Sequence, residues 1–415
     1  MEYIHRAVDR RLDVLAAHFP AIAIDGPKAV GKTETARRRV RTVFRMDSED
    51  DQNRFLAVDL VNETRRGPLL IDEWQRLPQS WDLVRRAVDN GAPPGSIYLT
   101  GSATPQAGVT THTGAGRIMS VRLRPLGLCE LTVNPAAISL TALCEGGIAI
   151  EGQSDTDLAG YLTKMYTTGF PAAMGFPADM QQEFLASYAA RIVDRELPAQ
   201  GYTIRNRFGL QSWLHAYAQV TGTDASYSEI LARATEGSGD APSKRTTAVY
   251  REKLDEIWMF DELPAWESPT HQIPGQTRSP KHYLADVALG LHLAGIRRSS
   301  LNTSENSGLL GRFFEAYAVH SLRVAATAAG LRSGHVRTKK RAHEVDLVLE
   351  TLDGRVLAFE IKLAGSIRDE DVRHLHWLRT IVGDDLVEAA VVYTGTHAYR
   401  RPDGVAVIPL ALIGV

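Results

Sequence analysis

The stretch AIAIDGPKAVGKTETARRRV, residues 21–40, places a glycine-rich turn between a short apolar run and a basic segment of good helix formers. Residues 26–33 within it fit the pattern G-x-x-x-x-G-K-[ST]. A buried strand, a glycine turn and a helix in this order predict a loop whose backbone N–H groups face phosphate oxygens. The N-terminus of the helix adds the positive end of its dipole to that site.

The pattern assigns a role to each residue of this predicted phosphate loop. We expect Lys32 to reach the β- and γ-phosphates of a nucleotide, and Thr33 to ligate Mg²⁺. The pattern assigns no role to the next residue, Glu34. The alternative is a plain strand-to-helix turn, which the flanking strand and helix disfavour. The predicted cofactor-binding residues of the loop are Gly26, Pro27, Lys28, Ala29, Val30, Gly31, Lys32 and Thr33.

Two apolar strands downstream end in polar residues that suit the same site. The run GPLLIDEWQRLP passes from apolar residues to Asp72 and Glu73. We expect Asp72 to hold the Mg²⁺ shell and Glu73 to polarise the attacking water as general base. The run SIYLTGSAT carries Thr100 and Ser102 at its polar end. Thr100 would contact the cofactor if this strand lies beside the first one, and a capped strand end is the alternative.

A further strand, GRIMSVRLRPLGLCEL, is basic and carries Arg117, Arg122 and Arg124. We take Arg117 as the candidate γ-phosphate-sensing or arginine-finger residue, because an arginine cation stabilises the charge of a transferring phosphoryl group. A surface arginine without that role is the alternative.

The motifs GPKAVGKT, LLIDEWQRLP, YLTGSAT and GRI…RLRPLGLCEL together resemble the AAA-type ATPases of bacteria and archaea that carry a C-terminal domain of unknown function. The resemblance covers nearly the whole chain. The family usually has arginine and glutamine where this chain has Lys28 and Ala29, a departure that leaves the phosphate ligands untouched. The resemblance implies an AAA+ core with ATP as substrate. It carries the nucleotide-binding roles onto Gly26, Gly31, Lys32, Thr33, Asp72 and Glu73.

Composition restricts the partners and the compartment. Lys and Arg number 47 and Asp and Glu 49 in 415 residues, so any nucleic-acid contact needs a local basic patch. The two cysteines, Cys129 and Cys144, have no metal-ligand spacing and exclude a disulfide framework, which favours a reducing cytoplasm. The charged N-terminal segment does not resemble a signal peptide, and no apolar run reaches membrane-spanning length. We expect a cytoplasmic protein with no membrane partner.

The expected fold class is α/β, with an AAA+ P-loop ATPase domain in residues 1–150, a helical and winged-helix domain in 151–300 and a third domain in 301–415. Three amphipathic helices and the strand DELPAW predict a winged helix-turn-helix in the middle domain. The third helix begins with Lys244, Arg245, Thr246 and Thr247, which suit phosphate contact. A protein–protein connector is the alternative.

The last domain begins with a long amphipathic helix that contains Glu315, followed by RAHEVDLVLE, a turn at Asp353 and Gly354, and VLAFEIKLA. The two apolar runs predict a β-hairpin. In it Asp346, Glu360 and Lys362 form D-x(13)-E-x-K, in which the acids would bind Mg²⁺ and the lysine would orient or activate water for phosphodiester cleavage.

The D-x(13)-E-x-K pattern looks like the active site of the restriction-endonuclease-like fold, whose leading helix often adds a glutamate. A hairpin with charged residues on its wet face is the alternative. We interpret His374 and His376 as a solvated helix face, since no third metal ligand stands near them.

The leading hypothesis is an Mg²⁺-dependent AAA+ ATP hydrolase. Its turnover would rearrange the winged-helix and nuclease-like modules on a target such as nucleic acid. The alternative hypothesis is a nucleotide-gated protein–protein scaffold that touches no nucleic acid. DNA or RNA, and further copies of the chain in a homo-oligomer, are left open as partners.

Overall fold

A five-stranded parallel sheet carries the N-terminal part of the chain. The computed structural model describes residues 3–103, 114–131, 138–236, 242–301 and 307–415. The strands run in the order β2-β3-β4-β1-β5. The three inner strands, β3, β4 and β1, are near-continuous apolar runs, as expected of parallel strands covered on both faces. The strand bounds are Ala21–Asp25 for β1, Thr42–Arg45 for β2, Leu69–Asp72 for β3, Ile97–Gly101 for β4 and Ile118–Arg122 for β5.

The order of these strands places β4 between β1 and β3. The condition set for a role of Thr100, that its strand lies beside the first one, is therefore met, with Thr100 paired to Ile24 and to Asp72. Because every pairing in this sheet is parallel, the carboxyl ends of β1, β3 and β4 lie along one edge.

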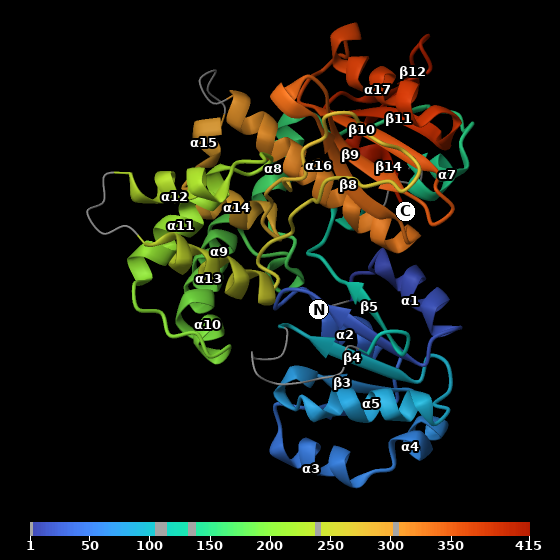
Figure 1. The fold of residues 1–415 in the computed structure, drawn as a ribbon, viewed down its shortest axis with the longest axis vertical. Helices are drawn as coiled ribbons and strands as arrows, with labels where there is room; N and C mark the ends of the chain where they lie inside the picture. The colour runs from blue at the N-terminus through green and yellow to red at the C-terminus, as the bar shows by residue number, and fades with distance from the viewer. Residues whose placement is uncertain (1–2, 104–113, 132–137, 237–241, 302–306) are drawn as a thin grey trace.

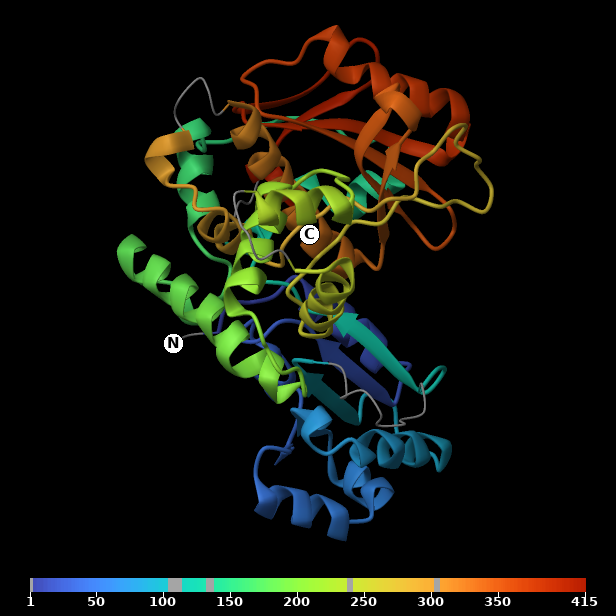
Figure 2. The same cartoon turned by 60° about the vertical axis from the view of Figure 1, so that its left-hand side comes forward.

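Short helices surround the parallel sheet, which Figures 1 and 2 show in blue and cyan at the far end of the molecule from the orange and red C-terminal strands. Two hydrophobic clusters, one on each face of the sheet, are built from alternate residues of its strands. The helices of this part are α1 Val8–Ala16, α2 Lys32–Arg37, α3 Glu49–Ala57, α4 Leu60–Arg66, α5 Gln79–Asp89 and α6 Leu128–Leu131.

Helices make up most of the middle of the chain. Serine side chains cap two of them: Ser226 precedes α12 in a capping box with Glu229, and Ser243 caps α13. These helices are α8 Leu158–Tyr166, α9 Ala178–Arg191, a π-helical turn Ile192–Glu196, α10 Leu197–Ala199, α11 Arg207–Gln219, α12 Tyr227–Thr235, α13 Lys244–Glu256, α14 Val287–Leu293 and α15 Arg298–Leu301.

The three expected helices α11, α12 and α13 are confirmed, whereas the expected wing has a different form. The segment 260–266 pairs with 281–284 through two isolated antiparallel bridges, Phe260 with Leu284 and Leu263 with Lys281. In the described part of this region the bridges do not extend into a regular hairpin.

The C-terminal part is built on a seven-stranded mixed sheet in the order β7-β12-β13-β11-β10-β9-β8. The predicted hairpin is confirmed by the antiparallel pairing of β9 with β10, and α17 then leads to β11, which is parallel to β10. The elements are α16 Ser307–Ala329, β8 Arg332–Arg337, β9 Glu344–Glu350, β10 Val356–Lys362, α17 Asp369–Val382, β11 Leu386–Tyr393, β12 His397–Arg400 and β13 Ala406–Pro409.

Alternate residues of β10 enter different cores. Leu357 and Phe359 pack in the cluster that includes α16, while Val356 and Ala358 pack in the cluster that includes α17. Period-two alternation therefore places the two helices on opposite faces of the hairpin.

Residues between the parallel sheet and the middle helices also join the C-terminal part. They form β6 Ile138–Ser139, which pairs with β14 Ile413–Gly414, and β7 Gly152–Gln153, which pairs with β12. Helix α7, Leu140–Glu145, lies between them. Residues on both sides of position 150 therefore pair with strands of the C-terminal part, whereas we expected a domain boundary at that position. Among the described helices, none is long and apolar enough to cross a membrane.

Candidate functional site

The predicted phosphate loop connects β1 to α2 and depends on two glycines. A Cβ atom at Gly26 would lie 2.2 Å from the carbonyl oxygen of Leu123, so any larger residue would push β5 away. Gly31, which precedes α2, has a φ of 99°, in the left-handed region that favours glycine. The loop is therefore held in a backbone shape that other residues would strain.

Lys32 begins α2 and is almost fully buried. Its Nζ donates to the carbonyl oxygens of Gly26 and Pro27, both at 2.8 Å. Burial lowers the pKa of Lys32 to about 8, although the charges of Glu73, Asp25 and Asp72 favour the ammonium. The ammonium thus bonds only neutral groups inside the loop, and phosphate oxygens would give it negatively charged partners in direct contact.

The two predicted Mg²⁺ ligands are in direct contact. Thr33 Oγ1 donates to Asp72 Oδ1 at 2.8 Å, and Thr100 Oγ1 on the neighbouring strand donates to the same oxygen. A threonine hydroxyl and a carboxylate are hard oxygen donors that suit Mg²⁺, so these residues fit the expected metal.

Glu73, the expected general base, directly follows β3. Its φ of 54° is uncommon outside glycine, and a short 3-10 helix, Trp74–Arg76, begins after it. Glu73 Oε2 accepts from Ser102 Oγ at 2.9 Å and from Gln75 Nε2 at 2.6 Å. Backbone conformation and two hydrogen bonds therefore fix the carboxylate beside the end of β4. Sequence reasoning missed Gln75, although it lies in the same quoted motif.

Arg117 does not lie where the sequence hypothesis needed it. It precedes β5, whose first residue, Ile118, pairs with Ala21 at the start of β1, whereas the phosphate loop follows the other end of β1. Arg117 Nε bonds Asp89 Oδ1 at 2.9 Å, and its side chain is about half exposed. The prediction of a γ-phosphate sensor within its own chain is therefore wrong, because a parallel strand carries this residue away from the loop.

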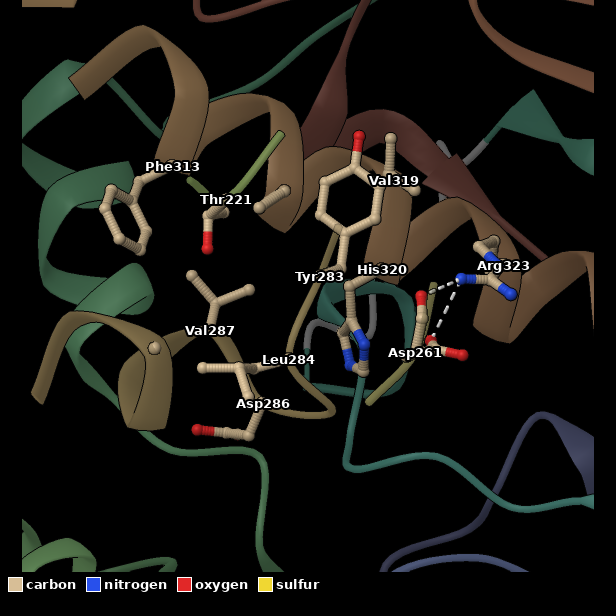
Figure 3. Close-up of a pocket in the computed structure, with 12 residues that line it drawn as sticks. Thr221, Asp261, Tyr283, Leu284, Asp286, Val287, Phe313, Val319, His320 and Arg323 are labelled. Atoms are coloured by element: carbon tan, nitrogen blue, oxygen red, sulfur yellow. Dashed lines mark hydrogen bonds and ion pairs between the residues drawn. The ribbon is translucent and has the colours of Figure 1, made fainter. Parts of the chain in front are cut away.

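The loop end of β5 carries Arg122 and Arg124 instead, and both bind Asp261 of the middle region. The distances to the Asp261 carboxylate are 3.1 Å from Arg122 Nη1 and 2.7 Å from Arg124 Nε. Arg323 of α16 adds a third contact at 3.2 Å, which Figure 3 shows. Against the effect of burial, these three cations hold the pKa of Asp261 far below its usual range.

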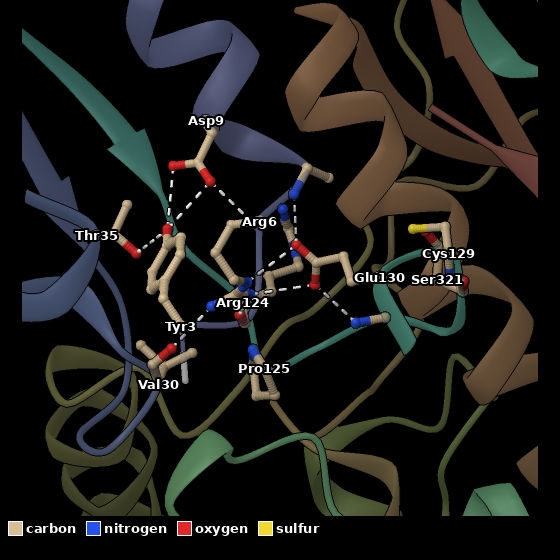
Figure 4. Close-up of polar contacts among 12 residues, drawn as sticks. Tyr3, Arg6, Asp9, Val30, Thr35, Arg124, Pro125, Cys129, Glu130 and Ser321 are labelled. Atoms are coloured by element: carbon tan, nitrogen blue, oxygen red, sulfur yellow. Dashed lines mark hydrogen bonds and ion pairs between the residues drawn. The ribbon is translucent and has the colours of Figure 1, made fainter. Parts of the chain in front are cut away.

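Arg6, which sequence reasoning also missed, connects the loop to β5. Its guanidinium donates to the carbonyl oxygens of Val30 at 2.9 Å and Arg124 at 2.6 Å, and pairs with Glu130 at 3.0 Å (Figure 4). The contacts run from the loop through Arg6 and Arg124 to Asp261, and so reach the other two parts of the molecule.

A pocket of about 390 Å³ opens beside the loop, between Lys28, Ala29 and Ser102 on one side and α9 on the other. Lys28 Nζ pairs with Glu196 Oε2 at 2.6 Å. Arg191 lines the pocket and is exposed, and within the described residues it makes no ion pair. The pocket therefore places an arginine of the middle region opposite the phosphate loop.

The C-terminal motif residues come together around a lysine that sequence reasoning missed. Lys281 is fully buried, and its Nζ lies 2.8 Å from Glu315 Oε1, 2.9 Å from Glu344 Oε1 and 2.9 Å from Asp346 Oδ1. Against the effect of burial, the charges of Asp346 and Glu315 hold the pKa of Lys281 well above its usual value.

Glu360 and Lys362 lie at the end of β10, beside this cluster. Lys362 Nζ contacts Glu360 Oε2 at 3.2 Å, and the buried Glu360 Oε1 has no hydrogen-bond partner among the described groups. Burial, and then the charge of Asp346, raise the pKa of Glu360 well above its usual value. The described residues hold no group of three or more His, Cys, Asp or Glu side chains placed to bind a metal ion. We expected Asp346 and Glu360 to bind a metal ion. In the structure the ammonium of Lys281 lies beside Asp346 instead.

Two other expected sites lie on the surface. Lys244 and Arg245 are exposed at the start of α13, as phosphate contact would require. On α17, His376 Nε2 contacts Asp403 Oδ2 at 3.2 Å, in line with a partly solvated helix face.

Comparison with known families agrees with the loop geometry. A family model described as an AAA domain matches residues 18–132. Two models described as domains of unknown function, DUF8612 and DUF4143, match residues 159–300 and 310–413. The AAA match and the site together support an AAA-type P-loop ATPase core with nucleotide-binding and ATPase activity.

The chain is also similar to whole proteins. Over 403 residues it is 27% identical to the uncharacterized proteins Rv2008c of Mycobacterium tuberculosis and Mb2031c of Mycobacterium bovis, an overlap of 94% of this chain and 80% of each relative. A solved structure, the Walker-type ATPase PABY2304 of Pyrococcus abyssi, aligns with 70% of this chain and 96% of its own, at 13% identity and a TM-score of 0.39.

Proposed function

We propose that the protein is an Mg²⁺-dependent ATP hydrolase whose site is the carboxyl edge of the parallel sheet. The observation that carries this proposal is the meeting of Thr33, Asp72 and Thr100 at one carboxylate oxygen, directly beside the phosphate loop. Thr33 and Asp72 would hold Mg²⁺, which, when bound, neutralises phosphate charge and orients the phosphates.

Other residues of the site would bind the phosphates and activate the attacking water. Lys32 and the backbone N–H groups of the loop would bind the β- and γ-phosphates. Glu73 would take a proton from the attacking water as the bond to the γ-phosphorus forms and the bond to the β,γ-bridging oxygen breaks, which yields ADP and phosphate. Ser102 and Gln75 keep the Glu73 carboxylate in place for that step.

The test of this function is phosphate release from ATP by the full chain, with Mg²⁺ and with EDTA. We expect turnover with Mg²⁺ that Thr33→Ala and Asp72→Asn each remove, because each variant loses one of the two proposed metal-binding groups. Turnover that survives EDTA, or survives both variants, would overturn the assignment.

We further propose that turnover is passed to the other parts of the molecule through Arg6, Arg124 and Asp261, with DNA or RNA as the target of the helical and C-terminal parts. The exposed Lys244 and Arg245 support a nucleic-acid target.

The alternative is a nucleotide-gated protein scaffold. The ATPase rate with and without DNA or RNA separates the two, since only a nucleic-acid target raises the rate. Sedimentation with and without ATP tests for the homo-oligomer.

A second candidate function is metal-dependent phosphodiester cleavage in a restriction-endonuclease-like C-terminal domain. It is supported by the gathering of Asp346, Glu360 and Lys362 at the adjacent strands β9 and β10. Because Lys281 occupies the centre of the cluster, the assay compares wild type with Lys281→Met on single-stranded, double-stranded and branched substrates. Asp346→Ala and Glu360→Ala should each abolish any cleavage and spare ATP hydrolysis. Lack of cleavage by both proteins would remove this candidate.

A further inference from the structure

A basic turn lies directly before β9. It is formed by Lys339, Lys340 and Arg341, all of which are exposed. Lys340 and Arg341 both have a left-handed backbone, with φ of 59° and 53°, which is uncommon for residues other than glycine. Two hydrogen bonds of 2.9 Å between Thr338 and His343 close the turn. The backbone therefore gathers three cations in one place before any partner binds.

Aromatic rings lie beside this turn, where it meets α17. Figure 1 shows α17 at the end of the molecule opposite the parallel sheet. The ring of His343 stacks on Trp377 of α17, with ring centroids 4.1 Å apart and an interplanar angle of 1°. His374, also on α17, meets His343 edge to face at 5.7 Å. All three rings are partly exposed, so cations and aromatic rings share one surface.

The cations of the turn have little counter-charge. Lys339 and Lys340 make no ion pair within the described part of the chain. Arg341 has one, with Asp224, at 3.9 Å. The acid next to His343 in the chain, Glu344, instead contacts a buried lysine at 2.9 Å. The positive charge of the turn is therefore available to an anionic partner.

Helix α17 adds a fourth exposed cation, Arg373, whose Nε donates to His374 Nε2 at 3.1 Å. Burial, and then the charge of Arg373, lower the pKa of His374 below its usual value. The imidazole is therefore mostly neutral at pH 7 and offers a ring rather than a charge. The charge of Lys362 acts on His374 in the same direction, so this surface borders the end of β10.

Such a surface matches the chemistry of a single nucleic-acid strand. Single strands alternate phosphates, which cations bind, with unpaired bases, which stack on aromatic rings. A duplex keeps its bases paired inside and would meet only the cations. An acidic protein segment would likewise use the cations but has no bases to stack on the rings.

We propose that the turn 339–341 and the adjacent face of α17 bind single-stranded nucleic acid. The inference rests on the nucleic-acid target proposed above, and it adds the surface and the form of the strand. It does not involve the acids of β9 and β10, so it holds whether or not the domain cuts phosphodiesters.

The experiment measures binding of the full chain to a fluorescein-labelled oligothymidylate, and to a duplex of the same length, by fluorescence anisotropy at several salt concentrations. The variant Lys339→Gln, Lys340→Asn, Arg341→Asn removes the three cations, and asparagine tolerates the left-handed backbone. We expect this triple variant to bind the single strand at least about tenfold more weakly. The slope of log affinity against log salt should fall by about 2, because each lost phosphate contact removes about 0.7.

A second variant tests the rings separately from the charges. His343→Ala keeps all of the cations and removes one ring of the stack. It should weaken single-strand binding by at least about fivefold and leave the salt slope unchanged, since base stacking releases no counterions.

The controls place the effect on this surface. Arg65→Ala with Arg66→Ala removes two exposed cations of α4, at the other end of the molecule, and should bind the strand like wild type. Lys244→Ala with Arg245→Ala tests the start of α13. Circular dichroism checks folding, and the ATPase rate without nucleic acid should be the same in the triple variant as in wild type.

The outcomes separate this inference from the function on which it rests. A wild-type protein that binds neither strand nor duplex would remove the nucleic-acid target altogether. Binding that survives in the triple variant and is lost only in the α13 variant would overturn this inference and keep the target. Loss in the triple variant with no effect of His343→Ala, or tighter binding of the duplex, would contradict recognition of a single strand and indicate a general polyanion site.

Discussion

The molecule holds two deeply buried lysines in opposite electrostatic surroundings. Lys32 bonds two neutral carbonyl oxygens, and burial lowers its pKa to about 8. Lys281 bonds three carboxylates, which hold its pKa well above the usual value. The first ammonium bonds only carbonyl oxygens directly, although three carboxylates lie near enough to favour its charge, and it is suited to receive phosphate. The second has its counter-charge from the carboxylates of the protein. The partners of a buried lysine, rather than its burial, therefore decide what it does.

The largest expected effect concerns the chemistry beside Lys32. Glu73→Gln keeps the shape and the metal shell but removes the base, so turnover should fall by about 10²- to 10⁴-fold. ATP should still bind and persist unhydrolysed, which phosphate release and a nucleotide-binding titration measure together. Near-wild-type turnover would mean that another acid acts as the base.

The buried ion cluster at Asp261 predicts a large effect on stability. Asp261→Asn leaves Arg122, Arg124 and Arg323 without their shared carboxylate, and breaking a buried ion pair costs about 3–5 kcal/mol. Urea unfolding followed by tryptophan fluorescence measures the loss.

The matched control for that variant is Asp194→Asn, which breaks the exposed pair with Arg207 and should change the free energy of unfolding by less than about 1 kcal/mol. Equal losses in the two variants would show that the cluster at Asp261 contributes no more than a surface pair.

A pH dependence should distinguish Lys32 from a fully satisfied lysine. Bound phosphates favour the charged ammonium, so ATP binding takes up a proton when free Lys32 is neutral. Because the pKa is about 8, the affinity for ATP should have its full value well below pH 8. Above pH 8 it should fall by about tenfold for each pH unit. Calorimetric titrations at pH 7, 8, 9 and 10 measure this fall. The weaker binding of Lys32→Ala should show no such slope, and a flat profile for wild type would contradict the lowered pKa.

The smallest effect is expected at Arg117. Arg117→Ala loses an exposed pair with Asp89 at the far end of β5 from the loop, so the ATPase rate should stay within about twofold of wild type. A large drop that depends on protein concentration would instead indicate that Arg117 acts on the site of a neighbouring copy in an oligomer.

The sequence predicted the parts of this site that are local in the chain. The loop, Asp72 with Glu73, and Thr100 each follow an apolar strand, and parallel pairing brings such strand ends to one edge. The same reasoning would have excluded Arg117, since it precedes its strand. The β9–β10 hairpin was likewise readable from two apolar runs around a turn.

Contacts between distant residues could not be predicted in this way. Arg6 pairs with a residue 124 positions away, and Lys281 meets Asp346 across 65 positions. Neither lies in a motif, and hydrophobic periodicity gives no information about the partner of a buried charge. The expected wing has a different form for a related reason: isolated bridges stand in the described residues where the sequence predicted a regular strand.

The most direct test of the central comparison is ATP binding by wild type, Lys32→Ala and Lys281→Met, measured by isothermal titration calorimetry with Mg²⁺. We expect Lys32→Ala to weaken binding by at least about a hundredfold, since a lysine that bonds two phosphates contributes charge-assisted hydrogen bonds. Lys281→Met, checked for folding by circular dichroism, should bind ATP with the wild-type affinity. Wild-type affinity in Lys32→Ala would contradict the account, because the buried lysine of the loop would then not be the phosphate-binding one.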